Sequence, residues 1–363
     1  MIYLDYNASA PLRPEARSAV DAILDATGNP SSVHGPGRRA RARIDQAREA
    51  LARWLGLDPS EIVFTAGATE ANNLALHGSA RPAISAMEHD SVRAPVGDRA
   101  IYLPAAGDGQ IDVDEAQRLI DQHQPDLVSV MAANNETGVI QPITNVASIA
   151  KNVGALVHVD AVQVPGRMDL APITAVADLL TLSSHKVGGP KGVGALVIRG
   201  GTRLPALMAG GGQERYRRPG TENDAGIVGF AAALTALEDG ESQRVRMLRD
   251  RFEAGVLARC AGVRIIGHEA PRIGNTSCLA LPGPRAETQV IAMDMAGLCV
   301  SAGAACSSGK VAASHVLAAM GLDDDIVERA VRMSFGWANT IEEADQALDI
   351  LEELCRGWSK RAA

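Results

Sequence analysis

Short apolar runs alternate with helical patterns along much of the chain. Residues 61–78 predict a strand, a tight turn and a helix. Residues 126–138, 155–163 and 177–186 each predict a strand that ends in polar residues, and 192–200 predicts one more strand. Apolar runs separated by helices are typical of a parallel, or mostly parallel, sheet. The pattern therefore predicts an α/β fold.

Two longer helices follow from apolar residues that recur every three or four positions. The arginines of segment 36–55 fall opposite its apolar face, so in this acidic chain we expect them to face solvent. That apolar face consists of Ala40, Ile44, Ala47, Leu51 and Trp54. Near the C-terminus, Thr340 followed by Glu343 has the pattern of a capping box before an apolar stripe. This last helix is predicted to be structural.

Composition limits the class of protein. The 363 residues are 46% hydrophobic and 21% charged, which predicts one large domain and a smaller one at roughly 100–200 residues per domain. The net charge of −8 argues against direct binding of nucleic acid and favours solubility. No signal peptide is visible, and the longest apolar stretch, 225–237, is shorter than the roughly 20 residues that cross a membrane. We expect a soluble, cytoplasmic protein.

The cysteines argue against a disulfide and against a metal site. Their number is odd and none forms a CxxC pair: Cys260, Cys278, Cys299, Cys306 and Cys355. A reducing cytosol disfavours disulfides, and zinc-type spacing is absent. Cys306 lies among small residues in SAGAACSSGK, 301–310. It is predicted to be either a buried structural cysteine or a reactive thiol.

Polar residues gather at the ends of the predicted strands, where ligands bind in such sheets. They are Thr69, Asn135, Asp160, Gln163, His185 and Lys186. Lys186 follows an apolar strand, so it either faces water or, in a dry pocket, forms a Schiff base. Asp160 either makes a buried salt bridge or pairs with a protonated pyridine nitrogen. Their occurrence on successive strands favours the second interpretation.

Four further features have both a functional and a structural interpretation. Ala68 and Thr69 begin a helix, where free N–H groups suit a phosphate, although a tight turn looks the same. His89 either stacks on a ring and moves protons or is structural. Arg332 either binds a carboxylate or makes an internal ion pair. The glycine-rich, basic segment 210–223 is predicted to be a long surface loop.

Taken together, these motifs resemble the cysteine desulfurases, the NifS/IscS-like branch of the class V aminotransferase family within the fold-type I pyridoxal phosphate (PLP) enzymes. The resemblance covers nearly the whole chain, in order: YLDYNASAP, NPSSVHGPG, FTAGATEANN, EHDSV, NNETG, HVDAVQ, SSHKVGGPKG, GGGQERYRRPGTEN, GAACSSG and VRMSFG. It implies a large PLP-binding domain at 15–250, with a mostly parallel mixed sheet. A smaller α+β domain would combine 1–14 with 251–363 and carry the catalytic cysteine.

The resemblance also implies roles for individual residues. Lys186 would bind PLP, Asp160 would pair with its ring nitrogen, Gln163 would contact the ring hydroxyl and His89 would stack on the ring. The phosphate would be held by Ala68, Thr69, Ser183 and His185, and by Thr221 from the other subunit of a homodimer. The substrate would contact Asn29, Asn135 and Arg332. Cys306 matches the catalytic cysteine.

The implied activity is the removal of sulfur from L-cysteine as a persulfide on Cys306, with release of L-alanine. The sulfur would pass to an acceptor protein, such as an iron–sulfur scaffold or a protein of tRNA or cofactor thiolation. A selenocysteine lyase or another class V enzyme is the alternative, against which Cys306 argues. A PLP-free scaffold in a sulfur-transfer complex is a third hypothesis, against which the retained Lys186 and Asp160 argue. The sequence departs from the family at Gly188 and Gly189, where a bulkier residue commonly precedes Gly-Pro.

Overall fold

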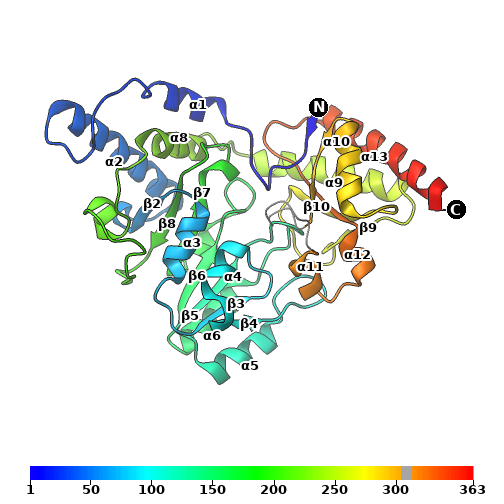
Figure 1. Ribbon diagram of the computed structural model, residues 1–363, viewed down its shortest axis with the longest axis horizontal. Helices are drawn as coiled ribbons and strands as arrows, with labels where there is room; N and C mark the ends of the chain where they lie inside the picture. Colours follow the sequence, from blue (N-terminus) through cyan, green and yellow to red (C-terminus); the bar gives the residue numbers. More distant parts are fainter. Residues whose placement is uncertain (304–312, 363) are drawn as a thin grey trace.

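The computed structural model describes residues 1–303 and 313–362. At its centre lies a seven-stranded sheet (Figure 1), whose strands in spatial order are β2 (Ile62–Thr65), β8 (Gly194–Ile198), β7 (Leu179–Ser183), β6 (Leu156–Asp160), β5 (Leu127–Met131), β3 (Pro82–Ser85) and β4 (Ile101–Leu103). Only β8 is antiparallel to its neighbours in this sheet. The predicted mostly parallel sheet is confirmed.

Helices cover both faces of this sheet (Figure 1). Along β8, Leu196 and Ile198 pack toward one face and Ala195 and Val197 toward the other, as the alternation of side chains in a strand requires. The first face is covered by α3 (Ala68–Leu76) and α4 (Asp90–Val96). The second is covered by α2 (Gly35–Leu55), α5 (Val113–His123), α6 (Ile143–Asn152) and α8 (Asp224–Thr235), with α1 (Pro14–Asp21) packed on α8. Helix α7 (Ala171–Thr174) packs on the same core as these helices.

Helix α2 confirms the predicted apolar face and corrects one expectation about its arginines. Ala40, Ile44, Ala47 and Leu51 are buried. Arg48, expected in solvent, is 3% exposed, because its guanidinium pairs with the buried Glu214 of the 210–223 loop at 2.6 Å. That loop is therefore anchored in the protein interior at Glu214 rather than lying wholly on the surface.

Most of the remaining elements form a second layer around an antiparallel sheet of β12 (Ser301–Ala302), β13 (Ala330–Ser334), β10 (Thr276–Ala280) and β9 (Arg264–Ile266). The N-terminal strand β1 (Ile2–Tyr3) pairs in parallel with β11 (Leu298–Cys299). The helices of this layer are α9 (Glu241–Arg259), α10 (Ala286–Met295), α11 (His315–Ala319), α12 (Asp324–Glu328) and α13 (Ile341–Ala362). The predicted capping box at the start of α13 is confirmed, since Thr340 and Glu343 each accept the other's backbone N–H.

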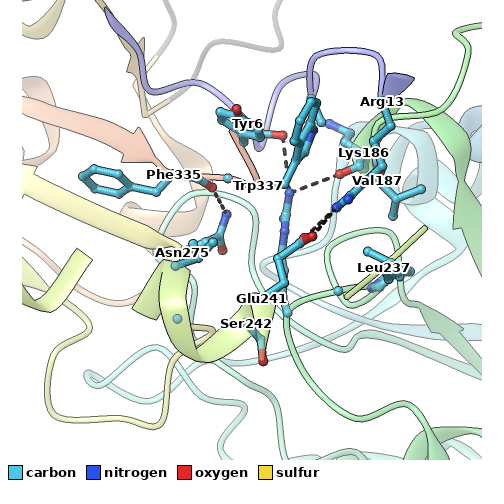
Figure 2. Close-up of a pocket in the computed structure, with 17 residues that line it drawn as sticks. Tyr6, Arg13, Lys186, Val187, Leu237, Glu241, Ser242, Asn275, Phe335 and Trp337 are labelled. Carbon is cyan, nitrogen blue, oxygen red and sulfur yellow. Dashed lines mark hydrogen bonds and ion pairs between the residues drawn. The ribbon is translucent and has the colours of Figure 1, made fainter. Parts of the chain in front are cut away.

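The two layers meet at a small cavity of about 30 Å³ beside Lys186 (Figure 2). Lys186 and Leu237 line it from the side of the large sheet, and Glu241 and Trp337 from the other. The division into residues 15–250 and residues 1–14 with 251–363 stays a prediction. Val245 of α9 packs with the buried apolar residues of the second layer.

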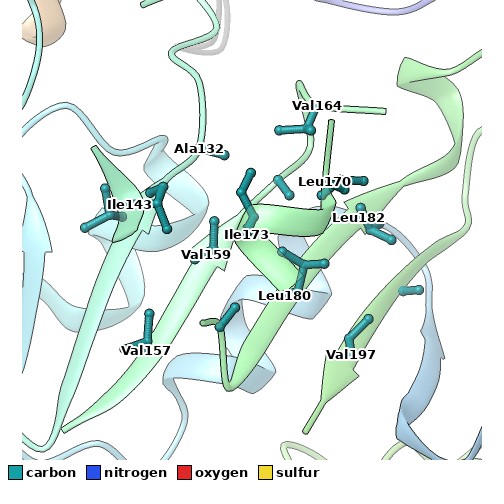
Figure 3. Packing of buried hydrophobic residues seen from close by; sticks show 14 of the residues in the cluster. Ala132, Ile143, Val157, Val159, Val164, Leu170, Ile173, Leu180, Leu182 and Val197 are labelled. Carbon is teal, nitrogen blue, oxygen red and sulfur yellow. The ribbon is translucent and has the colours of Figure 1, made fainter. Parts of the chain in front are cut away.

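The main core lies between the sheet and the second helical face (Figure 3). Val157 and Val159 of β6 and Leu180 and Leu182 of β7 point into it. The alternate residues of these two strands, including His158, Asp160 and Ser183, therefore face the other way, toward α3 and α4. In the described part of the chain, no helix combines the length and apolarity that a membrane span requires.

Candidate functional site

A cavity of about 960 Å³ opens beyond the carboxyl ends of the parallel strands. The strand order brings polar groups from distant parts of the chain to this one edge, where the sequence predicts a site. Ten predicted site residues line it: Ala68, Thr69, His89, Asn135, Asp160, Gln163, Ser183, His185, Lys186 and Arg332.

Lys186 reaches the cavity from a 3₁₀ turn, Ser184–Lys186, that directly follows β7. Its Nζ donates to the carbonyl oxygens of Asn7 and Ala8, the latter at 3.1 Å. The turn is tight because Gly189 lies against Ser184, where an added Cβ would be 2.1 Å from the hydroxyl oxygen. The lysine is thus held by the N-terminal segment and is not solvated as a surface lysine.

Asp160 ends β6, next to β7, and is 7% exposed. Its carboxylate accepts hydrogen bonds from Asn72 Nδ2 at 2.8 Å and from the backbone N–H of Val162 at 3.0 Å. Among the described residues, no lysine or arginine makes a salt bridge with it. A buried carboxylate is expected to have a cationic partner, so the geometry favours a cationic ligand over the internal salt bridge.

His89 precedes α4 and has a defined tautomer. Its Nδ1 accepts the backbone N–H of Ser91 at 3.0 Å, and the Ser91 hydroxyl lies 2.8 Å from the same nitrogen. The neutral ring therefore carries its proton on Nε2. Asn72 connects Ser91 to Asp160, since its Nδ2 donates to both at 2.8 Å. His89 and Asp160 thus belong to one hydrogen-bonded network.

A second group of residues in the cavity lining suits an anion. Ala68 and Thr69 are the first residues of α3, where backbone N–H groups are free and the helix dipole is positive. Ser183 Oγ is buried without a partner in the described structure. Burial lowers the pKa of His185 to about 4, with repulsion from Lys186 and Lys191 adding to the effect, so its ring is neutral near pH 7.

Arg332 enters the cavity from β13 and is 2% exposed. It makes the internal ion pair that was one interpretation of the sequence, with Asp5 at 2.7 Å, and it also donates to the carbonyl of Asn135 at 3.1 Å. Its Nε is buried with no partner among the described residues. Arg332 thus has N–H donors that these two contacts do not use.

Three predicted site residues are not part of this cavity as described. Asn29 and Thr221 are exposed and do not line it; Asn29 instead accepts the backbone N–H of Ser31 at 2.8 Å. Cys306 lies outside the described residues. The roles of these three residues stay predictions.

Comparison with known proteins places the chain in a family. The family described as aminotransferase class V matches residues 2–347. A cysteine desulfurase of Cereibacter sphaeroides is 41% identical, across 96% of this chain and 94% of the relative. The cysteine desulfurase IscS of Dictyoglomus turgidum is 38% identical, across 97% and 94%. This chain belongs to the cysteine desulfurases.

Solved structures confirm the fold of this cysteine desulfurase. A NifS-like protein is 34% identical with a TM-score of 0.88, covering 98% of this chain and 99% of that structure. The NifS-like protein from Rickettsia africae ESF-5 is 31% identical with a TM-score of 0.89 and the same coverage. The predicted fold-type I architecture is therefore confirmed.

Cysteine desulfurases of class V depend on PLP, and three features of the cavity fit this cofactor. The Asp160 carboxylate has no cationic partner within the described chain, and a protonated pyridine nitrogen would supply one. The unpartnered Ser183 hydroxyl and the start of α3 suit a phosphate. Lys186 lies in the same cavity. The residues present thus fit PLP.

Sequence patterns did not point to several residues of this cysteine desulfurase's site. Asn7 donates through Nδ2 to the carbonyl of Asn135 at 3.0 Å and offers its own carbonyl to Lys186. Asn72 and Ser91 connect His89 with Asp160, as described above. Each of these three residues lies within a motif that carries the family resemblance, and this was the one feature of the sequence that could have indicated them. The spacing of apolar and polar residues around them does not.

A row of polar side chains crosses the sheet beside Asp160. His158, on the same face of β6, has Nδ1 2.8 Å from Ser129 Oγ and Nε2 3.0 Å from Thr181 Oγ1. Burial lowers the pKa of His158 from 6.5 to about 4, and the charge of Asp160 offsets only part of this effect. The ring is therefore neutral in the folded protein near pH 7.

This histidine should make stability depend on pH. The unfolded chain binds the extra proton between about pH 4 and 6.5, so stability is complete above that window and decreases as the pH falls through it. The difference between the pKa of His158 in the unfolded and in the folded chain corresponds to on the order of 3 kcal/mol of folding free energy. Urea unfolding of the apoprotein should show a flatter pH dependence in His158→Gln, but not in the control His77→Gln, whose side chain is exposed. Equal slopes for His158→Gln and the natural protein would contradict this role.

Proposed function

We propose that this PLP-dependent cysteine desulfurase transfers the sulfur of L-cysteine to Cys306 as a persulfide, releases L-alanine and delivers the sulfur to an acceptor protein. The observation that carries the proposal is the presence in one cavity of Lys186, Arg332 and the Asp160 carboxylate, which forms no salt bridge with any described residue. A lysine, a partner for a ring nitrogen and a partner for a carboxylate are the groups that PLP chemistry on an amino acid needs.

Each side chain has a proposed role. PLP supplies the electron sink. Lys186 binds it and removes the Cα proton of cysteine, while Asp160 holds the ring nitrogen protonated and Gln163 contacts the ring hydroxyl. Ala68, Thr69, Ser183 and His185 hold the phosphate. Asn135 and Arg332 position the substrate carboxylate, for which the guanidinium of Arg332 has unused donors, and Asn29 lies near it.

Sulfur transfer then needs a nucleophile and a proton donor. The Cys306 thiolate attacks the substrate sulfur, an S–S bond forms, and the Cβ–S bond breaks with its electron pair left on the substrate carbon. That carbon takes up a proton on the way to alanine. His89 stacks on the ring and, with its proton on Nε2, serves as a proton donor at this end of the cavity.

The proposal includes a homodimer in which Thr221 reaches the phosphate in the partner's cavity. Thr221 is exposed and lies outside the cavity of its own chain. The α1–α2 connection and the 210–223 loop lie at the same end of the molecule (Figure 1). Both carry exposed large apolar side chains: Leu24, Val33 and Tyr216 are 64%, 87% and 80% exposed. Such surfaces are typical of protein interfaces.

The acceptor and the location are part of the proposal as well. A relative at 38% identity is named IscS, and we propose an acceptor protein of iron–sulfur cluster assembly or of tRNA or cofactor thiolation. Among the described cysteines, Cys260, Cys278 and Cys299 are free thiols. Free thiols fit the reducing cytoplasm proposed as the location.

The experiment that tests this function is Cys306→Ala. The variant should still bind PLP, and its absorbance should change when L-cysteine is added. The cavity residues proposed to bind the cofactor and the substrate are all unchanged in it. Formation of alanine and of protein persulfide should fall about a hundredfold or more, since the attacking nucleophile is gone. The matched control Cys299→Ala, which removes a partly exposed cysteine of the described chain, should keep both activities. Alanine formation at the natural rate by Cys306→Ala would refute the role of Cys306.

A further inference from the structure

Arg13 lies behind the Lys186 turn. It lines the small cavity between the two layers (Figure 2) and does not line the large one, whereas Lys186 lines both. Arg13 is 5% exposed although it belongs to no regular element and precedes α1. A guanidinium buried in this place needs a reason, because burying a charge is unfavourable unless it is paired.

Contacts of Arg13 with the Lys186 turn are close and directional. Its Nε donates to the carbonyl of Val187 at 2.9 Å, and its backbone N–H donates to the carbonyl of Gly188 at 2.8 Å. Gly188 has φ +86°, and a Cβ built there would lie 2.6 Å from Arg13 Cγ and 3.0 Å from the carbonyl oxygen of Pro11. The absence of a bulkier residue at 188 thus lets the stem of Arg13 pack directly on the turn.

The same side chain contacts the second layer. Its guanidinium pairs with both carboxylate oxygens of Glu241, the first residue of α9, at 2.6 and 2.8 Å. The guanidinium also lies over the ring of Trp337, 5.2 Å from its centroid. Trp337 follows β13, the strand that carries Arg332. Arg13 therefore contacts both the turn that carries Lys186 and the segment that follows the strand of Arg332.

We propose that Arg13 is a positioning residue that fixes Lys186 relative to Arg332; this inference rests on the roles proposed for those two residues. A proton can be taken from Cα only when the base is within a few tenths of an ångström of its productive place, and a displacement of about 1 Å can cost a hundredfold in rate. The cavity beside the turn leaves it without tight packing there. The Arg13 contacts hold the turn at Val187 and Gly188, in addition to the N-terminal carbonyls that hold Lys186 itself.

The test is the double variant Arg13→Met, Glu241→Leu, which removes the contacts and leaves no unpaired buried charge. Two rates should fall about tenfold: kcat for alanine formation, and the rate at which apoprotein captures added PLP. KM should change less than about twofold, because Arg332 is untouched. The melting temperature of the apoprotein should stay near that of the natural protein. A purely structural role would lower the melting temperature and leave both rates unchanged, which would overturn the proposal.

Two further variants complete the design. Arg13→Lys keeps a charge for Glu241, but a single ammonium cannot hold both Glu241 and the Val187 carbonyl; it should fold and be slower, and natural rates in it would also overturn the proposal. The control Arg251→Met, Asp345→Leu removes an exposed ion pair between α9 and α13, joined at 2.7 Å, and should leave both rates unchanged. Failure of the role of Lys186 itself is distinguishable, because Lys186→Ala would then still capture PLP with the natural absorbance.

Discussion

Replacing Lys186 with alanine should abolish alanine formation from L-cysteine, with a loss of about a thousandfold or more, and remove the absorbance of lysine-bound PLP. Proton transfer by a positioned side chain contributes about 10²–10⁴-fold, and Lys186 would in addition lose the covalent attachment of the cofactor. Purified variant mixed with PLP and cysteine is assayed for alanine, and its absorbance spectrum is recorded in parallel.

Lys191 supplies a matched control for this prediction. It lines the same cavity five residues further along the chain and is exposed. Lys191→Ala removes a side chain of the same size and charge. Lys191, however, comes after the turn, whereas Lys186 is the last residue of the 3₁₀ turn that follows β7. We expect it to keep the PLP absorbance and most of the activity. Equal losses in the two variants would show that positive charge at the cavity, not the position of Lys186, is what matters.

Arg48→Met should lower the free energy of unfolding by about 3–5 kcal/mol, the effect of leaving a buried charge without its partner. Arg48 and Glu214 have 4% and 2% of their side-chain surface exposed, and two nitrogens of Arg48 contact the two oxygens of Glu214 at 2.9 and 2.6 Å. Glu214 also accepts the backbone N–H of Phe64 on the edge strand β2 at 2.9 Å. Urea unfolding of the apoprotein measures the change.

The double variant Arg48→Met, Glu214→Gln should recover most of this stability, because the unpaired charge is gone and the amide still accepts the Phe64 N–H. Arg118→Met is the surface control: Arg118 pairs with Glu115 at 2.6 Å, but both side chains are largely exposed, and such pairs contribute about 0–1 kcal/mol. If Arg48→Met were as stable as the natural protein, the loop would not be anchored by this ion pair.

Local patterns were sufficient to predict the framework of the fold. The apolar face of α2 and the capping box of Thr340 and Glu343 depend on residues only a few positions apart. The sequence therefore reveals both directly. The central strands were predictable because both faces of the sheet are covered and their runs are apolar. Reversal of β8 was not predictable, since its run is as apolar as those of the parallel strands.

The site was predictable only in part. Asp160 and Lys186 stand out because ionisable groups interrupt or end apolar strands. Asn7 and Arg48 do not stand out, because their structural roles depend on contacts with residues far along the chain. These partners are Asn275 for Asn7 and Glu214 for Arg48. Periodicity places Arg48 on a helix, but it cannot reveal that a loop 166 residues away buries a carboxylate against it.

The pairing of β1 with β11 has a consequence for biogenesis. Ile2 is synthesised early, and its strand partner Leu298 is made almost three hundred residues later. The segment after β1 supplies the Asn7 and Ala8 carbonyls that hold Lys186. At about 5–20 residues per second, this interval lasts about 15–60 s. The nascent chain can therefore complete its sheet core long before it completes its active site, so a ribosome-bound fragment that ends before β11 should be folded in part and inactive.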